Sequence, residues 1–325
     1  MRLPVELRAA IEIETETIPH RDLTFAVAEL TSSYKQGGTG GPAINSAAKL
    51  GAYLQVRLPA TFAANWRVFQ EIATLAPEWQ PGSVLDLGAG PGTAMWAAAE
   101  VFPSTETFNL VERDRKILEA GRRLAQSSQM QAVRDAAWLP SDLAENAAGE
   151  ADLVVISYAL GELTPQERRS AIEFAWSRAR QMLVVIAPGT PGDFRTILDA
   201  RAQLLDLRAH VLAPCPHESA CPMGNGNDWC HFAQRLERTA DHRRLKSGAL
   251  GYEDEKFSYV VASRAASARA TARILRHPQK HSGHVQLRLC TGSGLVQMTV
   301  TKSQKENYRR ARKAEWGDPW DAASE

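Results

Sequence analysis

Hydrophobic positions change their spacing along the chain, and the changes divide it into three parts. In the middle part, short runs of β-forming residues alternate with segments of helical periodicity. The strands expected there are 84–87, 107–112, 151–157, 182–187 and 257–262. Strands that alternate with helices are joined by right-handed crossovers, which make a sheet largely parallel. The middle part is therefore predicted to be α/β, with ligands at the carboxyl ends of its strands.

The part that precedes this alternation has helical spacing. Leu23, Val27 and Leu30 follow a helical repeat. Two further helices are expected at 47–56 and 63–75, separated by a break around Pro59. Residues 1–80 are therefore predicted to form a helical N-terminal region.

The part that follows returns to short alternating segments. Antiparallel strands are expected near the end of the chain, at 271–275, 284–289 and 295–301, before a basic helix at 306–313. The predicted division is a helical region, a Rossmann-like domain with a cysteine-rich insertion, and a small basic β-rich extension. Their expected bounds are 1–80, 81–263 with the insertion at about 208–235, and 264–325.

The first strand of the middle part runs into a glycine turn. The sequence reads Val84-Leu85-Asp86-Leu87-Gly88-Ala89-Gly90-Pro91-Gly92, and helix formers follow it. Glycines let a backbone approach a ligand closely, and the N-terminus of the next helix offers free N–H groups. Dinucleotide-binding turns have the spacing Gly-x-Gly-x-x-Gly, whereas this one is Asp-x-Gly-x-Gly-x-Gly. It resembles motif I of the class I methyltransferases that depend on S-adenosylmethionine (SAM); the alternatives are NAD and a turn that binds nothing.

An acid at the end of the second strand adds to this prediction. Glu112 follows Gly92 by twenty residues, where a carboxylate can hold ribose hydroxyls, and Asp114 is its nearby competitor. The residues expected to bind SAM are Asp86, Gly88, Ala89, Gly90, Gly92, Glu112 and Ser157.

The segment that should face a methyl acceptor lacks a recognisable motif. Amino-directed methyltransferases often place Asn/Asp-Pro-Pro and an aromatic residue there, whereas this chain has Ser157-Tyr158-Ala159-Leu160. Tyr158 is a candidate for stacking on a base or for packing in the core. Glu162 is a candidate base or an exposed loop acid. Catalysis is therefore left open by the sequence, because a fold does not establish a function.

Composition places the chain among globular proteins without a membrane span. Its 325 residues contain no apolar run near the roughly 20 residues that cross a bilayer. Acidic residues follow Met1 closely, which is unlike a secretory signal or a transit peptide. We therefore expect a cytoplasmic protein.

Positive charge is concentrated near the C-terminus. The net charge is only +1, yet residues 264–313 hold twelve Lys and Arg against a single acid, Glu306. A basic block on an otherwise acidic chain indicates a polyanionic partner, most simply nucleic acid. The alternative is a solvated basic face.

Cysteines provide the clearest chemical signal. Cys215, Cys221 and Cys230 fall within sixteen residues, and Cys290 follows much later. Four thiolates suit an iron–sulfur cluster or Zn²⁺. The spacing lacks paired Cys-x2-Cys knuckles, and Pro216 and Pro222 follow two of the cysteines, which favours a cluster. His217 and His231 keep zinc as an alternative, and absence of a metal is a third.

A nucleophilic cysteine is the competing interpretation of this segment. Pro214-Cys215 matches superficially the Pro-Cys context of some pyrimidine methyltransferases. The strand ends that should face a substrate, however, carry no cysteine. The sequence therefore favours metal binding over nucleophilic catalysis.

Several stretches together resemble one known family. They are Tyr-Leu-Gln-Val-Arg-Leu-Pro-Ala-Thr-Phe at 53–62, the glycine turn, Ser-Tyr-Ala-Leu-Gly-Glu-Leu at 157–163, Cys-Pro-His-Glu at 215–218, Trp-Cys-His-Phe at 229–232, and 276–285 leading to Cys290. The chain is similar to the methyltransferase-like family associated with the mitochondrial ribosomal small subunit, which has bacterial relatives (the Rsm-twenty-two family). It looks like a bacterial-type member, which is expected to be a monomer when free.

The resemblance implies cofactors, a partner and a role. It implies a [4Fe–4S] cluster on Cys215, Cys221, Cys230 and Cys290, SAM-type binding at the glycine turn, and a role on small-subunit ribosomal RNA in assembly or translation. The leading hypothesis is therefore an RNA-binding assembly factor built on a methyltransferase fold. The alternatives are an active ribosomal RNA methyltransferase, a zinc-containing RNA-binding protein, and a redox sensor acting through the cluster.

Overall fold

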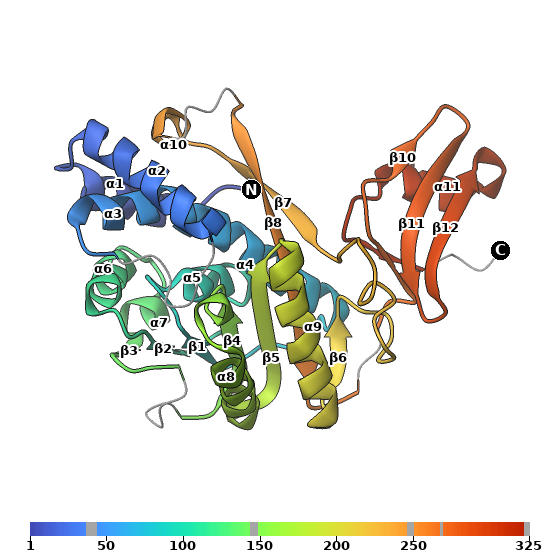
Figure 1. The fold of residues 1–325 in the computed structure, drawn as a ribbon, viewed down its shortest axis with the longest axis horizontal. Coiled ribbons are helices and arrows are strands. Elements are labelled where there is room, and N and C mark those ends of the chain that lie inside the picture. Colours follow the sequence, from blue (N-terminus) through green and yellow to red (C-terminus); the bar gives the residue numbers. More distant parts are fainter. Residues whose placement is uncertain (37–43, 144–148, 246–249, 267–268, 322–325) are drawn as a thin grey trace.

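The computed structural model describes residues 1–36, 44–143, 149–245, 250–266 and 269–321. Figure 1 shows a central sheet flanked by helices, the N-terminal helices at one side, and a separate small sheet toward the C-terminus. The α/β class predicted for the middle part is confirmed.

Eight strands form the central sheet. They are β1 (Ser83–Leu87), β2 (Thr107–Val111), β3 (Ala137–Leu139), β4 (Ala151–Ser157), β5 (Ala179–Pro188), β6 (His210–Ala213), β7 (Phe232–Glu237) and β8 (Tyr252–Ser263). Their order is β3-β2-β1-β4-β5-β8-β6, with β7 also paired to β8. The first five strands pair in parallel, and β8 is antiparallel to β5, β6 and β7. This is the Rossmann-like arrangement of the class I SAM-dependent methyltransferases, as predicted.

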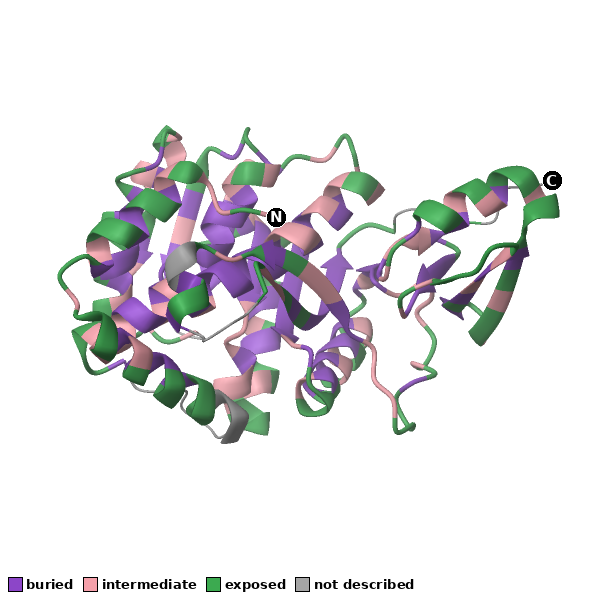
Figure 2. Ribbon diagram, turned by 90° about the horizontal axis from the view of Figure 1, so that it is seen from above, coloured by how far each residue is buried: buried purple, intermediate pink, exposed green. Residues whose placement is uncertain are grey.

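Helices cover both faces of this sheet. They include α5 (Thr93–Val101), α6 (Arg115–Ala125), α7 (Gln131–Arg134), α8 (Pro165–Arg178) and α9 (Pro191–Asp206), with a 3₁₀ turn at Leu160–Glu162 and α10 (Ala240–Leu245) near the hairpin of β7 and β8. Side chains alternate along a strand, so Leu153 and Val155 pack on the side of α5, and Val154 and Ile156 on the side of α8 and α9. Figure 2 shows the resulting buried centre.

The N-terminal helices differ from the prediction at one point. They are α1 (Val5–Thr15), α2 (His20–Gln36), α3 (Ala47–Ala52) and α4 (Leu58–Leu75), with a π-helical turn at Tyr53–Arg57. The break predicted around Pro59 is wrong, because helical structure continues from Ala47 to Leu75. Pro59 lies in the first turn of α4, where its missing N–H matters least, and the N–H of Leu58 bonds to the oxygen of Tyr53.

A second sheet of five strands forms near the C-terminus. Its elements are β9 (Ala272–Ile274), β10 (Gln279–Lys280), β11 (His284–Thr291), β12 (Gly294–Thr301), a 3₁₀ turn at Lys302–Gln304, α11 (Lys305–Lys313) and β13 (Pro319–Trp320). The pairs are antiparallel, as expected from the alternating pattern. Ile274, Leu287 and Trp320 contribute to a core of its own. The residue bounds proposed for the three parts stay predictions.

Candidate functional site

The glycine turn adopts the backbone conformation that its sequence requires. Gly88, Gly90 and Gly92 have φ angles of 73°, 56° and 81°, which residues with a Cβ rarely adopt. A Cβ at Gly88 would lie 2.7 Å from the Cβ of Ala159. At Gly90 it would meet only the hydroxyl of Tyr53, at 3.5 Å. The turn therefore leaves space above Gly90, where backbone is open to a ligand.

Two carboxylates lie beside this turn, and they differ in their partners. Asp86 is 1 % exposed, and neither of its oxygens has a hydrogen-bond partner in the described part of the chain. Glu112 accepts hydrogen bonds from the N–H of Gly90 at 2.9 Å and of Asp114 at 2.8 Å. Asp114 caps α6 by accepting from the N–H of Lys116, so Glu112 is the acid that contacts the turn.

Burial determines the protonation of Asp86. It raises the pKa of that carboxyl to about 8, and the nearby charge of Glu112 adds to the effect. Burial also raises the pKa of Glu112. A buried acid without a partner fits a ligand that carries positive charge, such as the ammonium and sulfonium groups of SAM.

A pH-dependent stability follows from Asp86. Between about pH 4 and pH 8 the folded protein keeps a proton that the unfolded chain has lost, so this residue's contribution to stability falls as pH rises. In the ligand-free protein, Asp86→Asn is expected to remove this decrease of the free energy of unfolding with rising pH. Urea denaturation at pH 5 and pH 8 measures the free energy of unfolding. If it changes equally with pH in the two proteins, the assignment to Asp86 is contradicted.

The three candidate residues of the segment expected to face a methyl acceptor, Ser157, Tyr158 and Glu162, each contact another side chain. Ser157 accepts a hydrogen bond from Asn65 of α4 at 2.9 Å. Tyr158, whose φ is 61°, donates its hydroxyl to Glu255 at 2.8 Å, and burial raises its pKa well above the usual value. Glu162 pairs with Arg113 at 3.1 Å, and burial raises its pKa. The hydroxyl of Tyr158 is thus a neutral donor whose bond to Glu255 fixes its direction.

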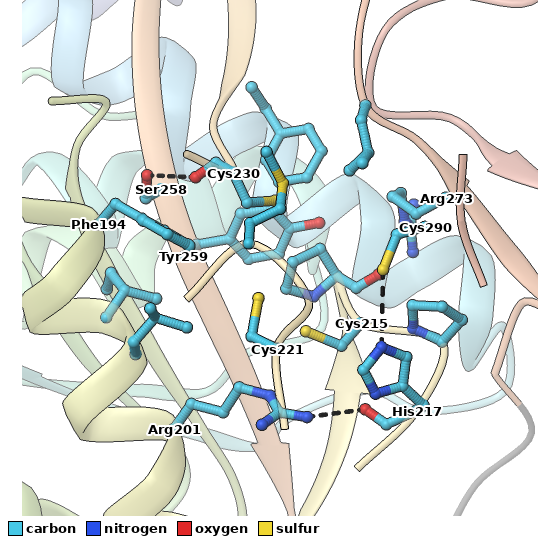
Figure 3. Close-up of a pocket in the computed structure, with 17 residues that line it drawn as sticks. Phe194, Arg201, Cys215, His217, Cys221, Cys230, Ser258, Tyr259, Arg273 and Cys290 are labelled. Atoms are coloured by element: carbon cyan, nitrogen blue, oxygen red, sulfur yellow. Dashed lines mark hydrogen bonds between the residues drawn. The ribbon is translucent and has the colours of Figure 1, made fainter. Parts of the chain in front are cut away.

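All four cysteines line one cavity. Cys215, Cys221 and Cys230 come from the segment between β6 and β7, and Cys290 comes from β11 of the second sheet. The cavity has a volume of about 540 Å³, counting the part that is open to solvent. Figure 3 shows the side chains of Cys215 and Cys221 side by side, and Cys290 turned toward His217. The sulfur of Cys290 lies 3.6 Å from Nε2 of that histidine.

Hydrogen bonds to backbone oxygens fix the cysteine segment. The hydroxyl of Ser258 on β8 donates to the oxygen of Cys230 at 2.8 Å. Arg273 on β9 donates to the oxygen of Pro214 at 2.9 Å, and Arg273 is also the β-ladder partner of Cys290. One residue therefore links the start of the segment to the strand that carries the fourth cysteine.

The thiols fit a metal group by their number and by their surroundings. Among the described residues, no three His, Cys, Asp or Glu side chains are grouped closely enough to hold a single metal ion. All four cysteines nevertheless line the same cavity. Burial raises the pKa of Cys290 to about 12, and burial with the three other thiols raises that of Cys230. Metal ligands are thiolates, so a metal group here would bind with release of protons.

The two histidines of the zinc alternative have different positions. His217 lines the cavity, where burial lowers its pKa. His231 is stacked on Trp229 with ring centroids 4.8 Å apart, and it does not line the cavity. His231 is therefore a packed residue in this structure, and His217 is the histidine adjacent to the thiols.

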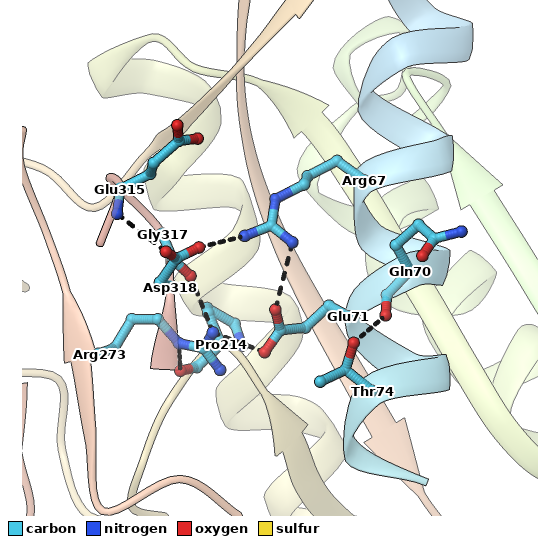
Figure 4. A network of polar contacts seen from close by, with 9 residues as sticks. All are labelled: Arg67, Gln70, Glu71, Thr74, Pro214, Arg273, Glu315, Gly317 and Asp318. Carbon is cyan, nitrogen blue, oxygen red and sulfur yellow. Dashed lines mark hydrogen bonds and ion pairs between the residues drawn. The ribbon is translucent and has the colours of Figure 1, made fainter. Parts of the chain in front are cut away.

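A buried ion-pair network lies behind the cysteines and was not predicted. Arg273, 2 % exposed, donates to Glu71 of α4 at 2.6 Å and to the oxygen of Gly317 at 2.9 Å. Arg67, also on α4, contacts Glu71 at 3.6 Å and Asp318 at 3.1 Å. Figure 4 shows how these residues join α4 to the C-terminal sheet.

The basic segment is divided by the fold. Five of its arginines contact residues that precede the segment, namely Arg264, Arg269, Arg273, Arg276 and Arg288. A second set is exposed, on β10, the turn after β12 and α11: Lys280, Lys302, Lys305, Arg309, Arg312 and Lys313. Arg312 donates to the oxygen of His281 at 3.2 Å, which places α11 beside β10. This exposed set is called the α11 surface below.

None of the helices in the described ranges is both long enough and apolar enough to span a membrane.

Solved structures with a similar fold include the magnesium protoporphyrin IX methyltransferase of Synechocystis PCC 6803 with bound SAH. That pair has 13 % identity and a TM-score of 0.44, covering 70 % of this chain and 90 % of that one. A putative RNA methyltransferase from Pyrococcus horikoshii has 14 % identity and a TM-score of 0.39, covering 77 % and 98 %.

Two relatives are similar in sequence. The human mitochondrial ribosome assembly protein METTL17 is 30 % identical over 284 residues, which cover 82 % of this chain and 61 % of the human protein. The mitochondrial ribosome assembly protein RSM22 of Saccharomyces cerevisiae is 26 % identical, covering 35 % and 29 %. This chain thus spans less than two thirds of either relative. Residues 47–321 match the family described as mitochondrial small ribosomal subunit Rsm22. The chain belongs to the Rsm22 family.

Proposed function

We propose that this chain is a ribosomal small-subunit assembly factor that binds rRNA, with SAM at the glycine turn and a [4Fe–4S] cluster at the cysteines. The observation that carries the proposal is the cavity where four thiols from two distant segments meet, in a chain of the Rsm22 family. The relatives named above are ribosome assembly proteins. Co-sedimentation with immature small subunits tests the role, and absence from those particles would contradict it.

The cluster would be held by Cys215, Cys221, Cys230 and Cys290. When bound, it would supply a covalent link between the cysteine segment and the C-terminal sheet, and a centre that oxidants can alter. Zinc bound by the same thiols is the alternative. The chain's own part is to hold the cysteine segment at the cavity, through the bonds that Ser258 and Arg273 make to the segment's backbone.

SAM would be held by Asp86, Gly88, Ala89, Gly90, Gly92, Glu112 and Ser157. Gly90→Val is expected to weaken SAM binding at least about tenfold, because the new side chain enters the space above the turn. The left-handed backbone there also costs a residue with a Cβ about 1–2 kcal/mol. Titration calorimetry with SAM measures the affinity.

Gly149→Val is the matched control for this substitution. A Cβ at Gly149 would have no neighbour within 4 Å, so this variant should bind SAM like the unchanged protein. Equal SAM affinity of Gly90→Val and Gly149→Val would show that the ligand lies elsewhere.

The α11 surface would supply the contacts to rRNA phosphates. Lys305 and Lys313 lie on one side of α11, eight residues apart, and both are exposed. Replacing both by glutamine should weaken binding to rRNA fragments and reduce the slope of log K against log salt by about 1.5. Filter binding between 50 and 200 mM KCl, concentrations chosen to span about a fourfold range of salt, measures this slope.

The control for charge alone is a pair of exposed arginines on the helices of the central domain. Arg169 on α8 and Arg195 on α9 become glutamine in that variant. Its salt slope should stay unchanged. If the slope of log K against log salt decreases equally in both variants, positive charge anywhere on the protein contributes to RNA binding. That result would contradict a defined contact at the α11 surface.

An active rRNA methyltransferase is the alternative function. Tyr158 and Glu162 are its candidate catalytic residues, and the hydroxyl of Tyr158 is fixed by Glu255. Incubation of the protein with labelled SAM and immature small subunits separates the two, because transfer of label to RNA would refute the inactive form of the proposal. A cytoplasmic location and a monomeric free state stay predictions.

A further inference from the structure

Arg201 is a buried cation without an acidic partner. It lies on α9, is 5 % exposed and lines the cysteine cavity. Its Nη2 donates to the backbone oxygens of His217 at 2.9 Å and Ser219 at 3.0 Å. Its Nε is buried without any partner, and no carboxylate of the described residues forms an ion pair with it. Buried charges are normally paired, so the missing counter-ion of Arg201 requires an explanation.

The lining of the cavity indicates where that counter-ion belongs. Two guanidinium groups, from Arg201 and Arg273, and four thiols line the cavity, and no Asp or Glu is among its described residues. Arg273 has its own acid, Glu71, at 2.6 Å. Figure 3 shows the guanidinium of Arg201 on the side of the cavity where Cys215 and Cys221 lie. The cavity thus combines surplus positive charge with thiols that become anionic as ligands.

We infer that Arg201 is the counter-ion and positioning residue of the metal group held by the four cysteines, and that its charge sets the reduction potential of that group. The inference rests on the proposed function. Four thiolates leave a bound cluster with net negative charge, and a buried guanidinium offsets it. Reduction adds a further negative charge, so a nearby cation favours the reduced state.

Two substitutions of Arg201 separate charge from shape. Arg201→Met keeps an unbranched apolar stem and removes the guanidinium with its charge, whereas Arg201→Lys keeps the charge and removes the planar donor group. Arg195→Met is the control, because Arg195 lies on the same helix and is exposed. Each full-length protein is purified anaerobically. EPR-monitored redox titration then gives its midpoint potential, and a chelator gives its rate of iron release.

The expected order is clear for both readouts. Arg201→Met should have a lower midpoint potential than the unchanged protein and should release iron several-fold faster. Arg201→Lys should have a midpoint potential close to that of the unchanged protein. Arg195→Met should have the same midpoint potential and the same rate of iron release as the unchanged protein. A potential and a release rate of Arg201→Met equal to those of Arg195→Met would overturn the inference, because a purely structural role leaves the potential in place.

Two further outcomes are also decisive. If Arg201→Met contains no cluster, a normal iron content in Arg201→Lys supports the inference that the positive charge is what the cluster requires. An Arg201→Lys protein that lacks iron to the same extent overturns the inference. If the unchanged protein contains zinc in place of iron and sulfide, the cluster proposal fails by itself. The chelator-dependent release of zinc then tests Arg201 in the same variants, with faster release from Arg201→Met in support and equal release against.

Discussion

Cys290→Ser is expected to yield a colourless protein with less than about one iron per chain, in place of about four. Cys290 is the only described cysteine of the cavity that comes from the C-terminal sheet. Its loss removes both a ligand and the link between that sheet and the segment 214–231. We therefore expect limited proteolysis to cleave residues 264–325 at least about tenfold faster, because metal binding and folding are coupled.

The control for this substitution lies on the same strand. Gln286 is on β11, partly exposed and outside the cavity. Gln286→Ser should keep its iron and its resistance to protease. A stable, fully coloured Cys290→Ser protein would refute the assignment of Cys290 as a ligand, whatever the remaining three cysteines hold.

Glu71→Leu is expected to lower the free energy of unfolding by about 3–5 kcal/mol, because it leaves Arg273 as an unpaired buried charge. Glu71 and Arg273 are both 2 % exposed, and their closest atoms are 2.6 Å apart. The double variant Glu71→Leu with Arg273→Met should recover much of the loss, since both charges are then absent. Anaerobic urea denaturation followed by tryptophan fluorescence measures the three proteins.

Thr74→Ala is the control on α4. Thr74 is exposed and its hydroxyl donates only to the oxygen of Gln70, so the expected change is within about 0.5 kcal/mol. A loss below about 1 kcal/mol in Glu71→Leu would show that the pair is solvated, and the link between α4 and the C-terminal sheet would then be weak.

The elements that follow a strong periodic pattern were predictable from the sequence. The glycine turn, the helix opened by Thr164, Pro165 and Glu167, and the long strands all have local causes. In the structure, Thr164 and Glu167 form a capping box at the start of α8. Strands β3, β6, β7, β10 and β13 were not predicted. Four of them have only two to four residues, and β7 is defined by its pairing with β8.

The site was predictable in its chemistry but not in its arrangement. Cysteine spacing pointed to a metal group, yet only the fold shows that Cys290 lies on a strand paired with Arg273. Arg201, Arg273 and Glu71 have no local signal, because their roles arise from burial against residues far away in the chain. The same burial divides the basic segment, whose charges seemed equivalent in the sequence.

The central claim is that the four cysteines hold a [4Fe–4S] cluster. Anaerobic purification of the unchanged protein followed by analysis of iron, acid-labile sulfide and zinc tests it most directly. The account predicts about four iron and four sulfide per chain, as a cubane cluster with four cysteine ligands requires. One zinc per chain without sulfide, or no metal, would contradict it.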